Sequence, residues 1–425
     1  MSDPFATALA ALTDAAEASN PTELSEEFIE EHIEIYRHLH AHPELSSCEH
    51  ETAAFIRTRL AELGVESFVS GGTGVVAVLE NGDGPVIAFR ADTDGLPILE
   101  QTGLDYASEA TGTLPNGDIA PVMHGCGHDT HVTAALGAVQ LLLERRSAWA
   151  GTVVFVFQPA EETAAGAKAM IDDGLWEQAP KPSVVLAQHV GPLPENVVFI
   201  SEGSMAMLGD SLRVTVHGKQ AHGSSPESSI DPIVLGASMV TRLQTIVSRE
   251  TSPRVPVVVT VGTFHAGLKE NIIPAAAEFT LNVRTPDEAT RDQVIEAIRR
   301  IISAEAAASR APEPTVEWIN SFPRLYNDPE HTFAMKGALE AEFGVGRVVD
   351  EKMGMGSEDA GWLGDAIGVP VVFWGFGCLP LASFATGEMP AANHSPFFRP
   401  DARGAVVTGA RAAMAGILHY VGTAR

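Results

Sequence analysis

Apolar residues recur along the chain at two spacings, and these spacings predict alternating helices and strands. Helical periodicity predicts helices over residues 24–39, 52–63, 132–145, 331–343 and 403–420. Short unbroken apolar runs predict buried strands over residues 74–80, 85–90, 151–157, 184–188 and 369–374. This alternation is typical of an α/β fold in which helices flank a mostly parallel sheet.

Glycine and proline mark where several of these elements end. Gly64 is placed to cap the helix over residues 52–63, and Pro43 should end the helix that precedes it. The turn Asn81-Gly82-Asp83-Gly84 separates the first two strand-like runs. Turn residues between two apolar runs predict a strand–turn–strand unit.

The pattern changes after Gly203. Strand-like and helical stretches then follow in the order β, α, β, β, α, over residues 211–217, 231–248, 255–262, 276–284 and 291–309. This order predicts a separate α+β domain with an antiparallel sheet and two helices. The first pattern resumes near Phe322. We therefore predict a discontinuous catalytic domain over residues 1–207 and 323–425, and an inserted lid or dimerisation domain over residues 208–322.

Composition narrows the class of protein. A chain of 425 residues is long enough for two domains, and 45% hydrophobic with 19% charged residues is typical of a globular enzyme. The net charge of −28 argues against nucleic acid or an anionic membrane as a partner. Three cysteines do not make a disulfide framework. Neither a secretory signal nor an apolar run of about 18 residues is present, so we expect a cytoplasmic protein.

Metal-ligand chemistry is concentrated between Met123 and His131, in the sequence Met-His-Gly-Cys-Gly-His-Asp-Thr-His. Cys126 and His128 alternate with glycines, which let the backbone turn so that both side chains point to one place. Thiolate, imidazole and carboxylate groups are ligands of zinc and related metals. The motif predicts a metal-binding loop that opens onto a buried helix; the alternative is a loop that is rich in histidine by chance.

Two aspartates follow a predicted buried strand. Asp92 and Asp94 come just after the run over residues 85–90. Open α/β sheets place their chemistry at the carboxyl ends of strands, which favours a functional role. The alternative is that both aspartates cap turns.

Glu161 and Glu162 follow the strand over residues 151–157, and His189 follows the next strand. Adjacent carboxylates at a buried strand end are costly unless cations neutralise them. Because consecutive residues point in different directions, one glutamate can bind metal while the other faces a bound water. The alternative is a solvated helix start. The histidines at positions 38, 40 and 42 are more simply explained as structural hydrogen-bonding groups than as ligands.

Together these motifs resemble the metallo-aminoacylase and carboxypeptidase family, and more narrowly its amidohydrolase branch of hippurate hydrolases, auxin-conjugate hydrolases and bacterial aminoacylases. The resemblance runs from about His38 to His394. It implies a two-metal site whose ligands match Cys126, His128, Glu162, His189 and His394. It also implies that Glu161 is the general base and that Asp94 orients the site from just outside it. Where the wider family has a histidine ligand, this chain has Asp92.

Three further matches lie in the inserted domain. His222 matches a histidine that reaches a neighbouring subunit's active site and steadies the developing oxyanion, which implies a homodimer. Asn271 and Arg284 match positions that hold the substrate's carboxylate end. The resemblance thus implies an N-acyl-amino-acid amidohydrolase that uses two divalent ions. Zinc suits the thiolate ligand, with manganese, cobalt or nickel as alternatives.

Three other functions fit parts of the sequence. A cysteine peptidase with Cys126 as nucleophile leaves Glu161, Glu162 and His189 without a role. A catalytically silent binding protein on the same fold leaves the general base unexplained. A dipeptidase or carboxypeptidase shares the two-metal chemistry and differs only in its substrate. The sequence does not decide which residues line the acyl-binding pocket. Four apolar residues are equally well explained as its lining or as ordinary packing: Phe376, Leu379, Leu381 and Phe384.

Overall fold

The computed structural model describes residues 21–351, 354–385 and 389–423. Two compact units emerge from the contacts among them. The first contains residues 21–205, 326–351 and 359–423 apart from 386–388, and the second contains residues 206–325 and 354–358. The short stretch 354–358 therefore belongs with the second unit, which the linear pattern did not indicate.

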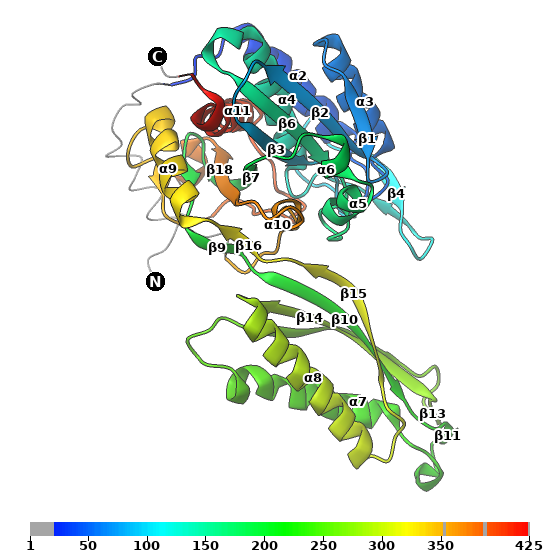
Figure 1. Ribbon diagram of the computed structural model, residues 1–425. Helices are drawn as coiled ribbons and strands as arrows, with labels where there is room; N and C mark the ends of the chain where they lie inside the picture. The colour runs from blue at the N-terminus through cyan, green and yellow to red at the C-terminus, as the bar shows by residue number, and fades with distance from the viewer. Residues whose placement is uncertain (1–20, 352–353, 386–388, 424–425) are drawn as a thin grey trace. The chain divides into compact units, whose positions relative to one another are not determined.

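The first unit is built on a mixed sheet in which ten described strands take part (Figure 1). Its main path is β1 (Ser67–Ser70), β2 (Gly74–Asn81), β6 (Gly151–Gln158), β3 (Val86–Asp92), β7 (Val185–Pro194), β18 (Val371–Leu379), β16 (Leu325–Asn327) and β9 (Gly203–Ala206). Two short strands, β8 (Val198–Phe199) and β17 (Val348–Val349), pair beside β18. The central pairs β6–β3, β3–β7 and β7–β18 are parallel, as predicted.

Helices cover this sheet. The longer ones are α2 (Glu26–Ala41), α3 (His50–Glu62), α4 (His128–Glu144), α9 (Pro329–Phe343) and α11 (Ala402–Val421). Shorter ones are α5 (Gly166–Asp172), α6 (Leu175–Gln178) and α10 (Gly361–Asp365). Helix α4 is buried on nearly all sides, and it begins four residues earlier than its apolar pattern predicts. Strands β3, β6 and β18 are buried along almost their whole length, as in sheets that are covered on both faces.

The predicted strand–turn–strand unit forms, although its two strands are not neighbours in the sheet. Strands β2 and β3 flank the glycine turn but do not pair with each other, because β6 lies between them. Strand β6 pairs antiparallel with β2 and parallel with β3. The turn residues correctly marked the break in the chain. Pairing depends on which strands pack beside each other in the folded sheet, and turn chemistry does not decide this.

The second unit is an antiparallel sheet with two helices. The sheet order is β12 (Val258–Ala266), β14 (Ala276–Thr285), β10 (Leu208–His217) and β15 (Thr315–Phe322). Helices α7 (Pro232–Thr245) and α8 (Glu288–Ala308) supply the rest of its core, and a π-helical turn over Ile246–Glu250 extends α7. Strand β15 is absent from the sequence-based prediction. It is an edge strand with mostly exposed or half-buried residues, so it lacks the apolar run used to find strands.

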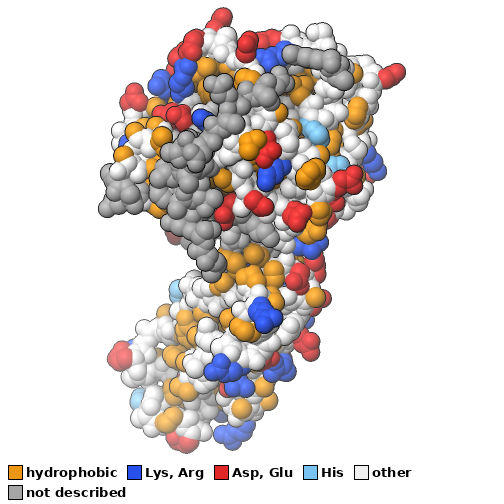
Figure 2. Space-filling model, turned by 90° about the vertical axis from the view of Figure 1, so that its left-hand side faces the viewer, with side chains coloured by type: hydrophobic (Ala, Val, Ile, Leu, Met, Phe, Trp, Pro, Cys, Tyr) orange, Lys and Arg blue, Asp and Glu red, His pale blue; other side chains and the backbone are white. Residues whose placement is uncertain are grey.

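Smaller elements complete the chain: a hairpin of β4 (Thr111–Thr113) and β5 (Ile119–Pro121), and a two-stranded pair of β11 (Ala221–His222) and β13 (Ile272–Ile273). Within the described residues, no helix is both long enough and apolar enough to cross a membrane. The face drawn in Figure 2 carries acidic side chains dispersed among neutral and basic ones.

Candidate metal centre

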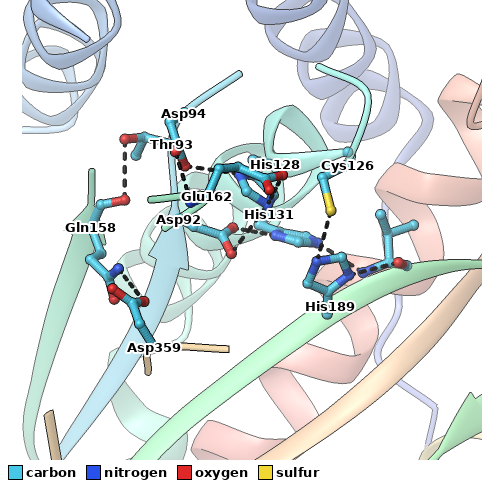
Figure 3. Close-up of polar contacts among 12 residues, drawn as sticks. Asp92, Thr93, Asp94, Cys126, His128, His131, Gln158, Glu162, His189 and Asp359 are labelled. Carbon is cyan, nitrogen blue, oxygen red and sulfur yellow. Dashed lines mark hydrogen bonds and ion pairs between the residues drawn. The ribbon is translucent and has the colours of Figure 1, made fainter. Parts of the chain in front are cut away.

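The predicted metal loop enters helix α4 through a glycine that cannot be replaced freely. Gly127 has a φ of 81°, and a Cβ there would lie 2.4 Å from Cγ1 of Val190. Only glycine takes this left-handed conformation without cost and also leaves room for Val190. The turn makes His128 the first helical residue and leaves Cys126 just outside the helix, so both side chains point to the carboxyl edge of the sheet (Figure 3).

His128 is held in one orientation by Asp94. Its Nδ1 lies 3.1 Å from Oδ1 of Asp94, and both side chains are buried. A carboxylate accepts, so Nδ1 carries the hydrogen and the lone pair is on Nε2. Nε2 is buried and has no hydrogen-bond partner among the described residues; carboxylate oxygens of Asp92 and Glu162 lie 3.6 and 4.0 Å from it. A buried nitrogen with an unused lone pair is what a metal ion requires.

His189 is arranged in the same way at the end of the parallel part of β7. Its Nδ1 donates to the carbonyl of Val190 at 2.8 Å, and its Nε2 lies 3.4 Å from Sγ of Cys126. Burial opposes ionisation of this thiol. The charge of the adjacent His189 and its hydrogen bond to the sulfur outweigh it, and they hold the pKa of Cys126 well below its usual range. The sulfur is therefore a thiolate, the form that binds metals.

Glu162 and His394 complete the cluster from two loops. His394 Nε2 lies 3.4 Å from Glu162 Oε1, and possible ligand atoms of these two residues and Cys126 lie within 4.8 Å of one another. Burial, and then the charge of Cys126, raise the pKa of Glu162 to about 7, while hydrogen bonds to Cys126 and Glu162 raise the pKa of His394 to about 10. Both shifts show that this pocket favours a positive charge, whether a proton or a metal ion.

Asp92 and His131 lie beside the cluster, but their atoms are already used. The backbone N–H of Val190 donates to His131 Nε2 at 2.8 Å, so His131 Nδ1 carries the hydrogen and donates to Asp92. Asp92 also accepts from the buried Arg90 guanidinium at 2.7 Å. Both nitrogens of His131 are thus engaged. The hydrogen-bonded pair of His131 and Asp92 therefore links β3 to the backbone of Val190, next to His189 (Figure 3). The sequence pattern did not reveal this link.

Glu161 lies next to Glu162 and is 5% exposed. Possible ligand atoms of His128, Glu161 and Glu162 lie within 4.8 Å of one another. The two glutamates do not start a helix, because the turn that carries them precedes α5. The alternative of a solvated helix start is therefore wrong. The donor set fits divalent metal ions: the group of Cys126, Glu162 and His394 and the group of His128, Glu161 and Glu162 share Glu162, and Nε2 of His189 lies beside the Cys126 sulfur.

Sequence reasoning missed two residues that hold this site, Ser46 and Glu49. Ser46 donates to Asp94 Oδ2 at 2.6 Å, and the fully buried Glu49 accepts from the backbone N–H of Ala160 at 2.8 Å. Neither residue belongs to an apolar repeat or to a run of metal ligands, so no signal in the sequence pointed to them. Four apolar residues were considered above as possible lining of the acyl pocket. Three of them, Phe376, Leu379 and Phe384, belong to the main hydrophobic core.

The three predicted residues of the second unit do not lie together. His222 pairs with Ile272 across the β11–β13 ladder, beside Asn271, whose carbonyl accepts from Gly223 N–H. Arg284 lies near the far end of β14 and donates to Asn282 and Ser357. A strand rises roughly 3.4 Å per residue, so the eight steps from Ala276 to Arg284 span about 27 Å. Within this unit, His222 and Asn271 lie at one end of the sheet and Arg284 at the other.

The histidines of the first helix are structural, as expected. His42 Nδ1 donates to the His38 carbonyl, and the ring of His38 stacks on Phe55. His40 is buried between two carboxylates, with Nδ1 2.7 Å from Asp129 and Nε2 3.1 Å from Glu100. Burial lowers the pKa of His40, but these two hydrogen bonds outweigh it and raise the pKa to about 9.

Replacing His40 by glutamine is expected to reduce stability in a pH-dependent way. The pKa of folded His40, about 9, exceeds the ordinary value of 6.5. Its contribution to stability is therefore complete below about pH 6.5 and is lost as the pH rises through about 9. The gap in unfolding free energy between wild type and variant should narrow by about 3 kcal/mol between about pH 6 and pH 10. Urea unfolding at several pH values measures this difference in unfolding free energy, with His42→Gln as the control at an exposed histidine. A difference that stays constant with pH would contradict the pairing of charged His40 with its two carboxylates.

Known proteins resemble this chain over most of its length. The model of peptidase family M20/M25/M40 matches residues 88–415. An N-acetylcysteine deacetylase of Bacillus subtilis is 38% identical over 332 residues, which cover 77% of this chain and 83% of the relative. Thermostable carboxypeptidase 1 of Saccharolobus solfataricus is 33% identical over 333 residues, which cover 77% of this chain and 81% of the relative.

A solved structure shows the same fold. It is a dinuclear metal-binding peptidase of family M20 from Bacillus subtilis, with 31% sequence identity and a TM-score of 0.72, and the match covers 93% of this chain and 99% of that one. The alternative of a cysteine peptidase does not explain these matches. The chain belongs to peptidase family M20/M25/M40, and it is a metal-dependent hydrolase of amide bonds.

Proposed function

We propose that the protein hydrolyses N-acyl amino acids to a carboxylic acid and a free amino acid. The observation that carries this proposal is the gathering of one thiolate, one carboxylate and three imidazoles beside a second glutamate, a cluster that is largely buried except for the exposed His394. The relative that deacetylates N-acetylcysteine supports an acylated amino acid as the substrate. The carboxypeptidase relative keeps a second candidate open, a peptide substrate cleaved by the same chemistry.

We propose the following five residues as ligands of two divalent ions, with zinc as the best match to the thiolate: Cys126, His128, Glu162, His189 and His394. When bound, the metal pair supplies Lewis acidity that polarises the amide carbonyl and makes water more acidic. Asp94 keeps His128 in the tautomer with a free Nε2, and it also accepts the backbone N–H of Glu162 at 3.1 Å. Asp94 thereby orients two ligands at once.

Glu161 acts as the general base in this proposal. Its carboxylate takes a proton from the attacking water as the oxygen bonds to the amide carbon, and it gives that proton to the departing nitrogen as the C–N bond breaks. The neighbouring Glu162 faces Cys126 and His394 and serves as a ligand instead. Consecutive residues that point in different directions allow one glutamate to bind metal and the other to move the proton.

Removal of the metals should abolish hydrolysis, and replacing them should restore it. We expect the purified protein to contain about two divalent ions per chain and to cleave at least one member of a panel of N-acyl amino acids. Dialysis against a chelator should remove both the ions and the activity, and zinc, manganese, cobalt or nickel added singly should show which one restores it. The panel should pair each N-acyl amino acid with the dipeptide of the same length. Faster cleavage of dipeptides would favour the peptidase candidate, and full activity without metal would contradict the proposal.

We further propose a homodimer in which His222 enters the neighbouring subunit's site and donates a hydrogen bond to the developing oxyanion. Two features of the second unit support this proposal. His222 and Asn271 lie at the opposite end of its sheet from Arg284, which we assign to the substrate's carboxylate. The edge strand β12 also exposes the apolar side chains of Val258 and Phe264, which a second subunit could cover. We place the protein in the cytoplasm, because the described cysteines are free thiols, as is usual in a reducing compartment.

Subunit mixing tests the shared site. Glu161→Gln and His222→Ala homodimers should each be nearly inactive. After subunit exchange, each mixed dimer holds one site with both residues intact, so an equal mixture should recover about a quarter of the wild-type rate. Light scattering measures the dimer, and native mass spectrometry measures the exchange. A monomer, or complete exchange without recovered activity, would contradict the proposal.

A further inference from the structure

Glu49 is a buried carboxylate to which no cation pairs among the residues that the structure describes. It is fully buried at the start of α3. Its side chain accepts three hydrogen bonds, from Ser47 N–H at 2.9 Å, Thr73 Oγ1 at 2.6 Å and Ala160 N–H at 2.8 Å, and all three donors are neutral. A carboxylate buried in this way is costly, and an apolar side chain would fill the same place without that cost. Its retention calls for a role that an apolar residue cannot perform.

Ala160, whose backbone N–H donates to Glu49, has an unusual backbone conformation. Its φ is 49°, in the left-handed region that residues with a Cβ disfavour by about 5- to 30-fold in population. It directly precedes Glu161, so the backbone at Ala160 sets the direction in which Glu161 leaves the chain. The carbonyl of Ala160 accepts from Ala165 and Gly166, and a Cβ on Gly166 would lie 1.5 Å from the Pro159 carbonyl oxygen. Residues 159–166 thus form a tight turn in which Ala160 and also Ala164, with a φ of 56°, have left-handed backbone.

The same short segment of chain also holds the neighbouring carboxylates. Ser46 donates to Oδ2 of Asp94, and the same oxygen accepts the backbone N–H of Glu162. The backbone N–H of Gly95 donates to the carbonyl of Glu44 at 2.7 Å. Residues 44–49 therefore contact the turn after β6 and the end of β3, the two places from which Glu161, Glu162 and Asp94 project.

We infer that Glu49 is a positioning residue: its carboxylate holds Ala160 in the left-handed conformation and thereby aims Glu161 at the substrate. This inference rests on the proposed role of Glu161 as general base. Without the bond from Ala160 N–H, the alanine relaxes toward right-handed backbone, and Glu161 turns away from the reacting amide. The hydrogen bonds to Glu49 from described residues come from Ser47, Thr73 and Ala160, none of which is a proposed metal ligand, so metal content should not change.

Three variants separate positioning from ordinary packing. Glu49→Leu removes the acceptor and should lower kcat about 5- to 30-fold, with little change in KM or metal content. Glu49→Gln keeps an oxygen for Ala160 and an amide for Thr73, so it should restore most of kcat. Thr73→Val removes only the bond to the other oxygen, Oε2, and should resemble wild type in kcat although it also loses a buried hydrogen bond.

A fourth change tests the conformational reason. Glycine adopts positive φ at little cost, so Ala160→Gly should make Glu49→Leu less harmful than it is in the wild type. Equal losses of kcat in both backgrounds would overturn the role assigned to Ala160. Hydrogen exchange of residues 159–166, followed by mass spectrometry, gives a readout that needs no substrate. Exchange there should be faster in Glu49→Leu than in Thr73→Val, and unchanged exchange would overturn the inference.

The outcomes distinguish this inference from the proposed function. If Glu161→Gln keeps the wild-type rate, the general-base proposal fails and the aim of Glu161 no longer matters for catalysis. If Glu161→Gln is inactive while folded Glu49→Leu keeps the wild-type kcat, the proposed function stands and the positioning role of Glu49 is wrong.

Discussion

Replacing Glu161 by glutamine should lower kcat by about 10²- to 10⁴-fold, the range that a positioned general base contributes. Glutamine has nearly the same size as glutamate and can still accept a hydrogen bond, but it cannot take a proton from water. Glu161 is buried next to Glu162 and His128 without being one of the proposed ligands. The variant should therefore keep its metal ions and fold normally. Steady-state kinetics on the panel substrate and metal analysis of the same sample measure both effects.

A matched control separates this effect from a general loss of negative charge. Glu66→Gln makes the same chemical change on an exposed residue and should leave the rate within about twofold of wild type, because the side chain lies on the surface. Loss of metal from Glu161→Gln would instead identify Glu161 as a ligand. A wild-type rate with full metal content would assign the proton transfer to another group.

Replacing Arg90 by methionine should destabilise the first unit by about 3–5 kcal/mol, a large part of the stability of a typical domain. Arg90 is fully buried on β3 and donates to three side chains: to Gln158 at 2.9 Å, to Asp92 at 2.7 Å and to Asp359 at 3.1 Å. Methionine fills similar space but leaves both aspartates buried without this cation. Urea unfolding of the metal-free protein measures the loss without a contribution from metal binding.

An exposed ion pair and a second substitution test the cause. Arg403→Met removes the partner of Glu26 on the surface of the same unit, and its cost should stay below about 1 kcal/mol because water screens both charges. In the Arg90→Met background, Asp359→Asn removes one uncompensated charge and should recover part of the stability. Failure of this second change to recover any stability would show that lost packing, rather than unpaired charge, causes the effect.

The order of elements was predictable from the sequence, and so were the residue types that we propose for the chemistry at the strand ends. Apolar runs marked β2, β3, β6, β7 and β18 because strands covered on both faces must be apolar along their length. The edge strand β15 was not predictable, because one of its sides faces water and it carries no such run. The contacts of β2 and β3 with β6 were also hidden, because pairing follows the packing of the whole sheet and not the turn between neighbours in sequence.

Residue type and spacing by themselves determined which groups we propose for the chemistry, because a thiol, imidazoles and adjacent carboxylates are recognisable wherever they stand in the chain. Tertiary structure alone decided which nitrogen of each histidine is available. His128 and His189 keep Nε2 because Asp94 and the Val190 carbonyl occupy Nδ1, whereas His131 uses both nitrogens. Only the folded chain brings Glu49 to Ala160, 111 positions away. Such contacts depend on distances in space, and a one-dimensional pattern contains no information about them.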